Sequence, residues 1–125
     1  MRTQDLIGAQ LDWAVAKCEG YECEFGDEVS GPWLVPQEGY LHDEKPLASF
    51  RPSTDWNLAG PIIDREAHNL FKHNGGTEWC CACNVPRDGY TAIVTADGPT
   101  PLIAAMRCFC CSKLGDEINI PEELK

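Results

Sequence analysis

The chain has 125 residues, of which 43% are hydrophobic, so it is long enough to bury a core and is expected to form a single domain over residues 1–125. Its formal net charge of −10 opposes contact with phosphate backbones, which argues against DNA or RNA as a partner. No apolar run approaches the roughly 18 residues of a membrane span, and Asp5, Gln10 and Asp12 interrupt the start of the chain, where a signal peptide would be apolar. We therefore expect a soluble, intracellular protein with no membrane partner, whose cysteines are reduced thiols or metal ligands.

The first predicted element is a helix that begins between Thr3 and Gly8 and ends near Cys18. Lys17 suits the last turn of a helix, and Gly20 can adopt the left-handed conformation that ends one. Trp13 is expected to pack in the core, with stacking on a ligand as the alternative. The apolar side of this helix is predicted from residues at helical spacing: Leu6, Ile7, Leu11, Ala14, Val15 and Cys18.

The stretch from residue 20 to residue 73 is divided by prolines into pieces that predict no long helix. Within it "YECEF" and "WLV" are typical of short strands, and "QEGYLHDEKPLASFRPST" is typical of a loop. Ser53, Thr54 and Asp55 can each accept hydrogen bonds from nearby backbone N–H groups, which predicts a fixed turn. Trp56 follows this turn directly.

The second half of the chain predicts two longer strands. In "TEWCCACNV", alternation places Trp79 and Cys81 on one face and Cys80 and Ala82 on the other. "GYTAIVTAD" is rich in β-branched residues and is bounded by glycines, which predicts a second strand.

A helix is predicted after this strand. Thr100 is a favourable N-cap, Pro101 suits the first helical position, and Gly115 ends the helix. "EINI" then predicts a final short strand. The buried stripe of the helix is expected to contain Leu102, Ile103, Met106, Phe109 and Cys110.

The strands are not separated by regular helices, so a parallel α/β architecture is not expected. The sequence instead predicts an α+β fold: a small single domain with two main helices packed on a short-stranded antiparallel or mixed sheet.

Three blocks of the sequence resemble the NinX family of tailed-phage proteins: "LIGAQLDWAVAKCEG", "PSTDWNLAGPIIDRE" and "GPTPLIAAMRCFCCSKLGDEINIPEEL". They occur in the family's order, at the start, middle and end of the chain. The resemblance implies a small phage-encoded accessory protein made inside a bacterium, and therefore located in the host cytoplasm. The family's function is uncharacterised, so the resemblance implies no catalytic residue and no cofactor. The cysteine clusters are not part of the family's pattern.

The cysteines form two C-x-x-C pairs, Cys80 with Cys83 and Cys108 with Cys111, separated by 24 residues. This spacing is similar to that of a four-cysteine zinc site. However, the first pair lies in a predicted strand, and the second lies late in an amphipathic helix. Free cysteine is also among the most buried residue types. We therefore expect reduced packing thiols and no metal, with structural zinc as the alternative.

The best candidate binding surface combines "STDW" with the following "IIDRE". Ser53, Thr54 and Asp55 offer hydrogen-bonding groups, Trp56 offers an aromatic plane and Arg65 a guanidinium, as a nucleotide-like ligand requires. In the alternative interpretation, Trp56 fills the core and Asp55 caps a turn.

Two further positions are candidates for binding an anion. The helix N-terminus at Thr100 could receive a phosphate or carboxylate, but we favour the alternative that Thr100 only caps its own helix, because capping explains every residue present. Arg107 is then either a pocket cation or a solvated helix residue.

Asp64, Glu66 and His68 lie within five residues, and alternation would place them on one strand face. Such a group suggests acid–base or metal chemistry, but no familiar catalytic motif accompanies it. We therefore assign no catalytic residue.

The leading functional hypothesis is stoichiometric binding during infection, either of a host protein or of a small anionic or nucleotide-like ligand. In its sharpest form, a homo-oligomer captures a nucleotide-type host signal and blunts host defence. One alternative is a zinc- or thiol-dependent protein interaction module. The other is a hydrolase of a nucleotide signal that uses Asp55, Asp64 or His68.

Overall fold

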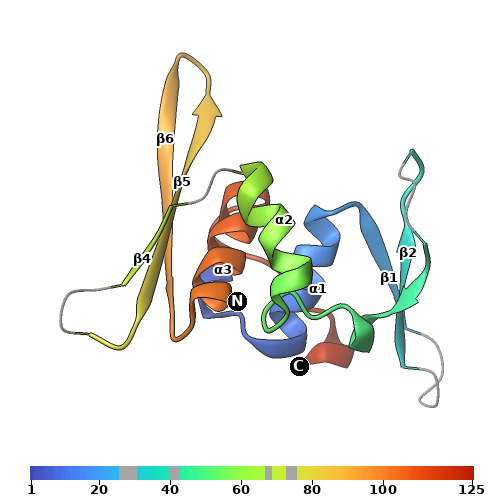
Figure 1. The fold of residues 1–125 in the computed structure, drawn as a ribbon. Helices are drawn as coiled ribbons and strands as arrows, with labels where there is room; N and C mark the ends of the chain where they lie inside the picture. Colours follow the sequence, from blue (N-terminus) through green and yellow to red (C-terminus); the bar gives the residue numbers. More distant parts are fainter. Residues whose placement is uncertain (26–30, 40–42, 67–68, 73–75) are drawn as a thin grey trace.

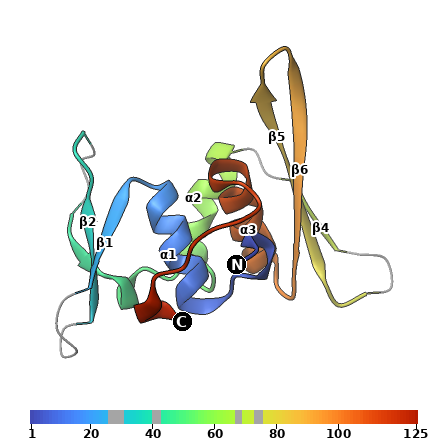
Figure 2. The ribbon, with the colours of Figure 1, turned by 180° about the vertical axis from the view of Figure 1, so that it is seen from behind.

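The computed structural model describes residues 1–25, 31–39, 43–66, 69–72 and 76–125. Within these residues, three α-helices lie in the middle of the molecule, with a three-stranded antiparallel sheet on either side (Figure 1). The view from behind shows the same arrangement, with both chain termini beside the helices (Figure 2). The elements are η1 (Thr3–Asp5), α1 (Gly8–Cys18), β1 (Tyr21–Phe25), β2 (Pro32–Pro36), β3 (Lys45–Pro46), η2 (Leu47–Ser49), α2 (Trp56–Glu66), β4 (Asn69–Lys72), β5 (Trp79–Arg87), β6 (Tyr90–Gly98), α3 (Pro101–Leu114) and η3 (Glu122–Leu124), where η is a 3₁₀ helix.

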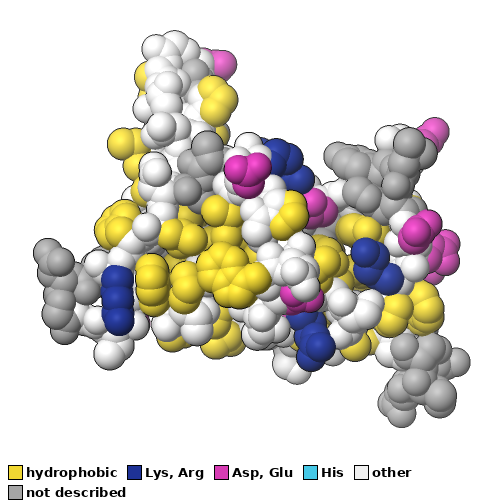
Figure 3. Space-filling model, viewed as in Figure 1, with side chains coloured by type: hydrophobic (Ala, Val, Ile, Leu, Met, Phe, Trp, Pro, Cys, Tyr) yellow, Lys and Arg dark blue, Asp and Glu magenta, His cyan; other side chains and the backbone are white. Residues whose placement is uncertain are grey.

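The larger sheet has the strand order β4-β5-β6. β5 and β6 pair along their whole length, from Trp79 opposite Gly98 to Arg87 opposite Tyr90. The expected alternation along β5 is confirmed, because Cys81 and Cys83 belong to the core that α3 completes, whereas Cys80 points to the other face. Figure 3 shows apolar side chains gathered over the middle of the molecule, between the two sheets.

The predicted helix α3 is confirmed with its cap. The Ile103 N–H donates to Thr100 Oγ1 at 3.1 Å, and Pro101 takes the first helical position. All five residues of the predicted stripe are buried, and so are Ala104, Ala105, Cys108 and Cys111. α3 is therefore a central core helix, covered by β5 and β6 on one side and by α1 and α2 on others.

The first predicted helix is confirmed as α1, and Trp13 is 7% exposed, in agreement with a core position. Ile7 departs from the expected apolar side because it precedes the helix in an extended conformation and is 53% exposed. Asp12 is buried, although sequence reasoning treated it only as a charge that interrupts an apolar run.

The expectation of no long helix between residues 20 and 73 is wrong, because α2 spans eleven residues despite Pro61. Proline removes one N–H and therefore one intrahelical hydrogen bond. Burial of Ala59 and Ile62 on one side of the helix favours helix formation here.

Three smaller expectations also change. Asp64 and Glu66 lie in the last turn of α2, so they do not share a strand face, and His68 lies outside the described residues. Glu117 of the "EINI" region forms only an isolated bridge with Arg2. The predicted loop at 37–54 contains β3 and η2, and it buries Leu47 and Phe50; residues 40–42 of it lie outside the described residues.

The α+β class is confirmed, and every strand pair is antiparallel. Compared with the expected two helices and one sheet, the described residues add a third α-helix and a second sheet. Among them, no helix combines the length and the apolar character that crossing a membrane requires.

Candidate functional site

The turn formed by "STDW" is fixed by hydrogen bonds, but of the three side chains predicted to accept from a backbone N–H, only that of Asp55 does so within the described residues. The Thr54 hydroxyl instead donates to the Arg51 carbonyl. The N–H groups of Thr54 and Asp55 both donate to the Arg51 carbonyl, at 3.1 and 2.8 Å. Asp55 Oδ1 accepts from the Asn57 N–H at 2.9 Å, so Asp55 caps the start of α2. The turn is therefore held rigidly at the point where it meets α1.

Ser53 connects this turn to α1 through a buried carboxylate. Its N–H donates to Asp12 Oδ1 at 2.9 Å, and each of the two residues is only 4% exposed. Burial raises the pKa of Asp12 above its ordinary value, and hydrogen bonds from Ser53 and the nearby charge of Arg51 oppose that rise. A carboxylate in this position needs its hydrogen-bond donor, because an unpartnered buried charge is costly.

A hollow of about 540 Å³ opens beside Asp12, and we call it the Asp12 hollow. Its size falls within the roughly 300–1,000 Å³ of typical small-molecule sites. α1, η2, the 51–54 turn and the C-terminal η3 contribute to its wall. Its lining residues are Gly8, Ala9, Asp12, Pro32, Leu47, Ala48, Arg51, Ser53, Thr54, Glu123 and Leu124.

A second hollow of about 310 Å³ lies at the other end of α1, between that helix and β1. Trp13, Lys17 and Tyr21 contribute to its wall. Trp13, for which stacking on a ligand was the alternative prediction, lies in its wall, whereas the larger Asp12 hollow contains Ser53 and Thr54 of the predicted binding surface. The Asp12 hollow is therefore the better candidate site.

Trp56 is exposed and is not among the residues that line the Asp12 hollow. It begins α2, two residues after Thr54, and 55% of its surface is accessible. The alternative prediction that Trp56 fills the core is therefore wrong, while the predicted cap by Asp55 is confirmed. An exposed indole next to a polar turn is available to stack on a planar group.

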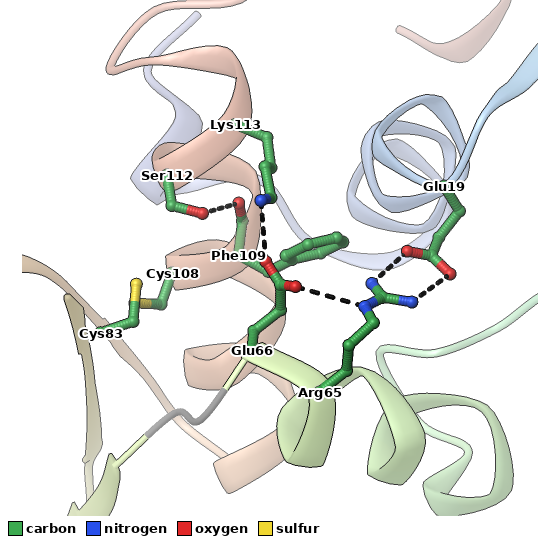
Figure 4. A network of polar contacts seen from close by, with 8 residues as sticks. All are labelled: Glu19, Arg65, Glu66, Cys83, Cys108, Phe109, Ser112 and Lys113. Atoms are coloured by element: carbon green, nitrogen blue, oxygen red, sulfur yellow. Dashed lines mark hydrogen bonds and ion pairs between the residues drawn. The ribbon is translucent and has the colours of Figure 1, made fainter. Parts of the chain in front are cut away.

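Arg65 lies at the opposite end of α2, roughly 13 Å along the helix axis from Trp56. Its guanidinium forms a two-pronged ion pair with Glu19, contacts Glu66 at 3.2 Å and lies over the Phe109 ring (Figure 4). Lys113 contacts the other oxygen of Glu66 at 2.9 Å. The structure therefore does not bring Arg65 together with Trp56, and instead uses it to join α2 to α1 and α3.

The charges of this network offset the effect of burial on Glu66. Burial by itself raises the pKa of this carboxyl, but hydrogen bonds from Lys113 and Arg65 outweigh burial and leave the pKa lowered. Glu66 is therefore ionised at neutral pH, and it forms ion pairs with Arg65 and Lys113 that join α2 to α3.

Thr100 and Arg107 are also separate from the Asp12 hollow. Thr100 uses its hydroxyl and its carbonyl to accept the Ile103 and Ala104 N–H groups, so capping occupies most of the first turn of α3. Arg107 donates to the carbonyls of Leu6 and Asp97, both at 2.8 Å. It is thus neither a solvated residue nor part of the hollow, and it ties the N-terminal segment to the end of β6.

All four cysteines of the C-x-x-C pairs are buried, but Cys80 lies on the opposite face of β5 from Cys83. Cys108 Sγ lies 3.5 Å from Cys83 Sγ and 3.4 Å from the Val94 carbonyl. Burial raises the pKa of Cys80 to about 11 and those of Cys83 and Cys111 to about 12, so these thiols are protonated at neutral pH. Among the described residues, no group of three or more histidine, cysteine, aspartate or glutamate side chains is placed to hold a metal ion.

Comparison with known protein families gives one match, to the family described as Bacteriophage P22, NinX, over residues 2–113. The match covers most of the chain. The protein belongs to this NinX family. Curated proteins provide no match.

In this NinX protein, sequence reasoning found Ser53 and Thr54 but missed Asp12 and Arg51, which share the hollow with them. Asp12 could have been recognised as a candidate because it is a carboxylate within the apolar run of α1, and a buried charge needs a hydrogen-bonding or charged partner. Glu123 and Leu124 lie beyond the family match and reach the hollow only through the fold.

Proposed function

We propose that this phage protein binds a small nucleotide-type ligand, one per chain, in the Asp12 hollow. The observation that carries the proposal is that Ser53 and Thr54 of the "STDW" turn, chosen from their residue types alone, form part of the wall of a ligand-sized hollow. In the host cytoplasm, such binding would withhold a host signal and blunt the defence that depends on it.

The residues around the hollow have complementary chemical roles in this proposal. Arg51 pairs with an anionic group such as a phosphate, Thr54 hydrogen-bonds hydroxyl groups, and Asp12 accepts from an N–H or O–H donor. Trp56, two residues along the chain from Thr54, supplies a plane on which a base can stack. The apolar wall, to which Leu47 and Leu124 contribute, receives the remainder of the ligand.

Capture is favoured over hydrolysis by the positions of the acidic residues. Asp55 precedes α2 and Asp64 lies in its last turn, nine residues later, which separates them by roughly 13 Å along the helix axis. Asp55 is engaged in capping α2. Turnover beyond one equivalent of ligand per chain would instead favour the hydrolase.

Native mass spectrometry of the full chain, purified gently from bacterial cells, tests the proposal. We expect an adduct on the order of several hundred daltons, one per chain, that is lost on denaturation. Arg51→Gln and Trp56→Ala should each lose this adduct while remaining folded.

Arg65→Gln is the matched control for Arg51→Gln. It makes the same substitution, but at the end of α2 far from Trp56, and it should retain the adduct. Wild-type masses that match integer numbers of chains alone would contradict ligand capture. If Arg65→Gln loses the adduct and Arg51→Gln keeps it, the ligand binds elsewhere.

A further inference from the structure

The β5–β6 hairpin projects beyond the helices, and its outer strand is open to solvent. Both ribbon views show its tip extending past α2 and α3 (Figures 1 and 2). β4 pairs only with Trp79–Ala82 of β5, so the distal half of the hairpin has two strands. Two-stranded hairpins are marginally stable by themselves in water, which makes an additional strand favourable here.

The hairpin register shows which backbone groups face outward. Asp88 and Gly89 form a two-residue turn, so Arg87 and Tyr90 are the first hydrogen-bonded pair of the ladder. Alternation from this pair directs the N–H and C=O groups of Thr91, Ile93 and Thr95 away from β5. Asp97 continues the same series, and its carbonyl does accept a hydrogen bond from outside the sheet, donated by Arg107.

The unpaired part of this edge therefore lies between Asp97 and the tip of the hairpin. In the described part of the chain, the outward backbone groups of Thr91, Ile93 and Thr95 have no hydrogen-bond partner. The side chains along the hairpin add apolar surface, since Ile93 is 71% and Tyr90 64% exposed (Figure 3).

This edge lacks the features that usually prevent strand pairing. Monomeric proteins protect exposed edges with charged residues, proline or bulges. The β5–β6 ladder is continuous, and residues 90–96 read Tyr-Thr-Ala-Ile-Val-Thr-Ala, with no charge and no proline. In a chain of net charge −10, this uncharged strip is where two copies can meet without direct repulsion.

We infer that β6 is a self-pairing edge, through which two copies of this chain form an antiparallel, two-fold dimer. A strand of like composition fits the neutral edge, whereas a basic partner would find no carboxylate between Tyr90 and Ala96. This inference is independent of the ligand proposed above.

One register satisfies all three outward residues. With Ile93 opposite Ile93 of the second copy, Thr91 lies opposite Thr95, and each of these pairs can exchange two hydrogen bonds. Threonine pairs and β-branched pairs are favourable across strands. The β4-β5-β6 sheet of one copy and that of the other then become one continuous sheet.

The expected association is weak and depends on concentration, because one strand pairing covers less than the roughly 1,200–2,000 Å² that stable complexes bury. Sedimentation velocity on the full chain should show the average mass rising from that of one chain toward that of two as concentration increases. Hydrogen exchange should slow at the amides of Thr91, Ile93 and Thr95 under the same conditions.

Two variants test the edge itself. Ile93→Lys places like charges face to face at the two-fold axis and should weaken association by about tenfold or more. Thr95→Pro removes an outward N–H without disturbing the ladder to β5, and it should also weaken the dimer. Thermal unfolding checks that both variants fold.

Asn84→Lys is the matched control for charge. Asn84 lies opposite Ile93 on β5, on the same exposed face, but one strand farther from the axis. The two added charges would then be roughly 14 Å apart, beyond the Debye length at about 0.1 M salt, so association should persist. A wild-type chain that stays monomeric at every concentration, or a dimer that both edge variants leave unchanged, would overturn the inference.

Discussion

Asp12 is the residue on which the candidate site depends most directly. Its carboxylate is buried in α1, and its hydrogen bond from Ser53 holds the 51–54 turn against the helix. Burial raises the pKa of Asp12 above its ordinary value of 3.8, so the folded state binds the proton more tightly than the unfolded state does. The stability that Asp12 contributes is therefore complete below pH 3.8 and is lost as the pH rises through the raised pKa.

We predict that Asp12→Asn becomes more stable relative to the wild type as the pH rises from below 3.8 toward neutrality. The asparagine amide oxygen can still accept from Ser53, but no charge is buried. Asp12→Ala should instead lose about 1–3 kcal/mol, because the Ser53 N–H is left without a partner. Melting temperatures of the three proteins across this pH range test the prediction, and a pH-independent difference for Asp12→Asn would contradict it.

At the scale of elements, the junction between β6 and α3 tolerates no side chain at Gly98. A Cβ atom there would lie 2.7 Å from the Ala104 backbone nitrogen and 2.9 Å from Ile103 Cγ2. This close approach sets the end of the strand directly against the helix that forms the centre of the core. Thr100 caps the helix within the same short connection.

We predict that Gly98→Ala destabilises the protein by about 1–3 kcal/mol, because the strand and helix must separate. Gly60→Ala is the control, since a Cβ at Gly60 in α2 meets no atom within 4 Å. That substitution should stabilise the protein by about 0.4–1 kcal/mol, through lower entropy of the unfolded chain. Chemical denaturation measures both changes, and equal effects of the two substitutions would contradict the proposed junction.

At the scale of the whole molecule, α3 and the strands around it enclose most of the cysteines. Six of the eight thiols are buried, namely Cys80, Cys81, Cys83, Cys108, Cys110 and Cys111. A hydrogen bond with Cys81, together with burial, raises the pKa of Cys108 far above its ordinary range. The thiolate is the species that reacts and binds metal, so the folded core protects these groups.

We predict that the buried thiols react with a disulfide reagent only as the protein unfolds, whereas all eight react in denaturant. A metal chelator should leave the melting temperature unchanged, because Cys80 and Cys83 point to opposite faces of β5. A lower melting temperature in chelator would favour the zinc alternative.

The elements that could be predicted correctly from the sequence are those whose signals are local. The cap at Thr100, the strand alternation around Cys81 and the end of α1 near Cys18 each depend on neighbouring residues, and the structure confirms them. The family was also readable from blocks of residues along the chain. The α2 helix was not predicted because proline ordinarily disfavours a helix by removing one of its hydrogen bonds. In the structure, burial of Ala59 and Ile62 outweighs that loss at Pro61.

Which candidate residues meet could not be predicted from the sequence, because it depends on contacts between distant segments. Ser53 joins Asp12 from a helix 41 positions earlier, and Glu123 reaches the same hollow from the C-terminus. Arg65, close to Trp56 in sequence, is turned by α2 toward Glu19. Such contacts between distant segments depend on how helices and sheets pack together, and no local pattern of residue types encodes that packing.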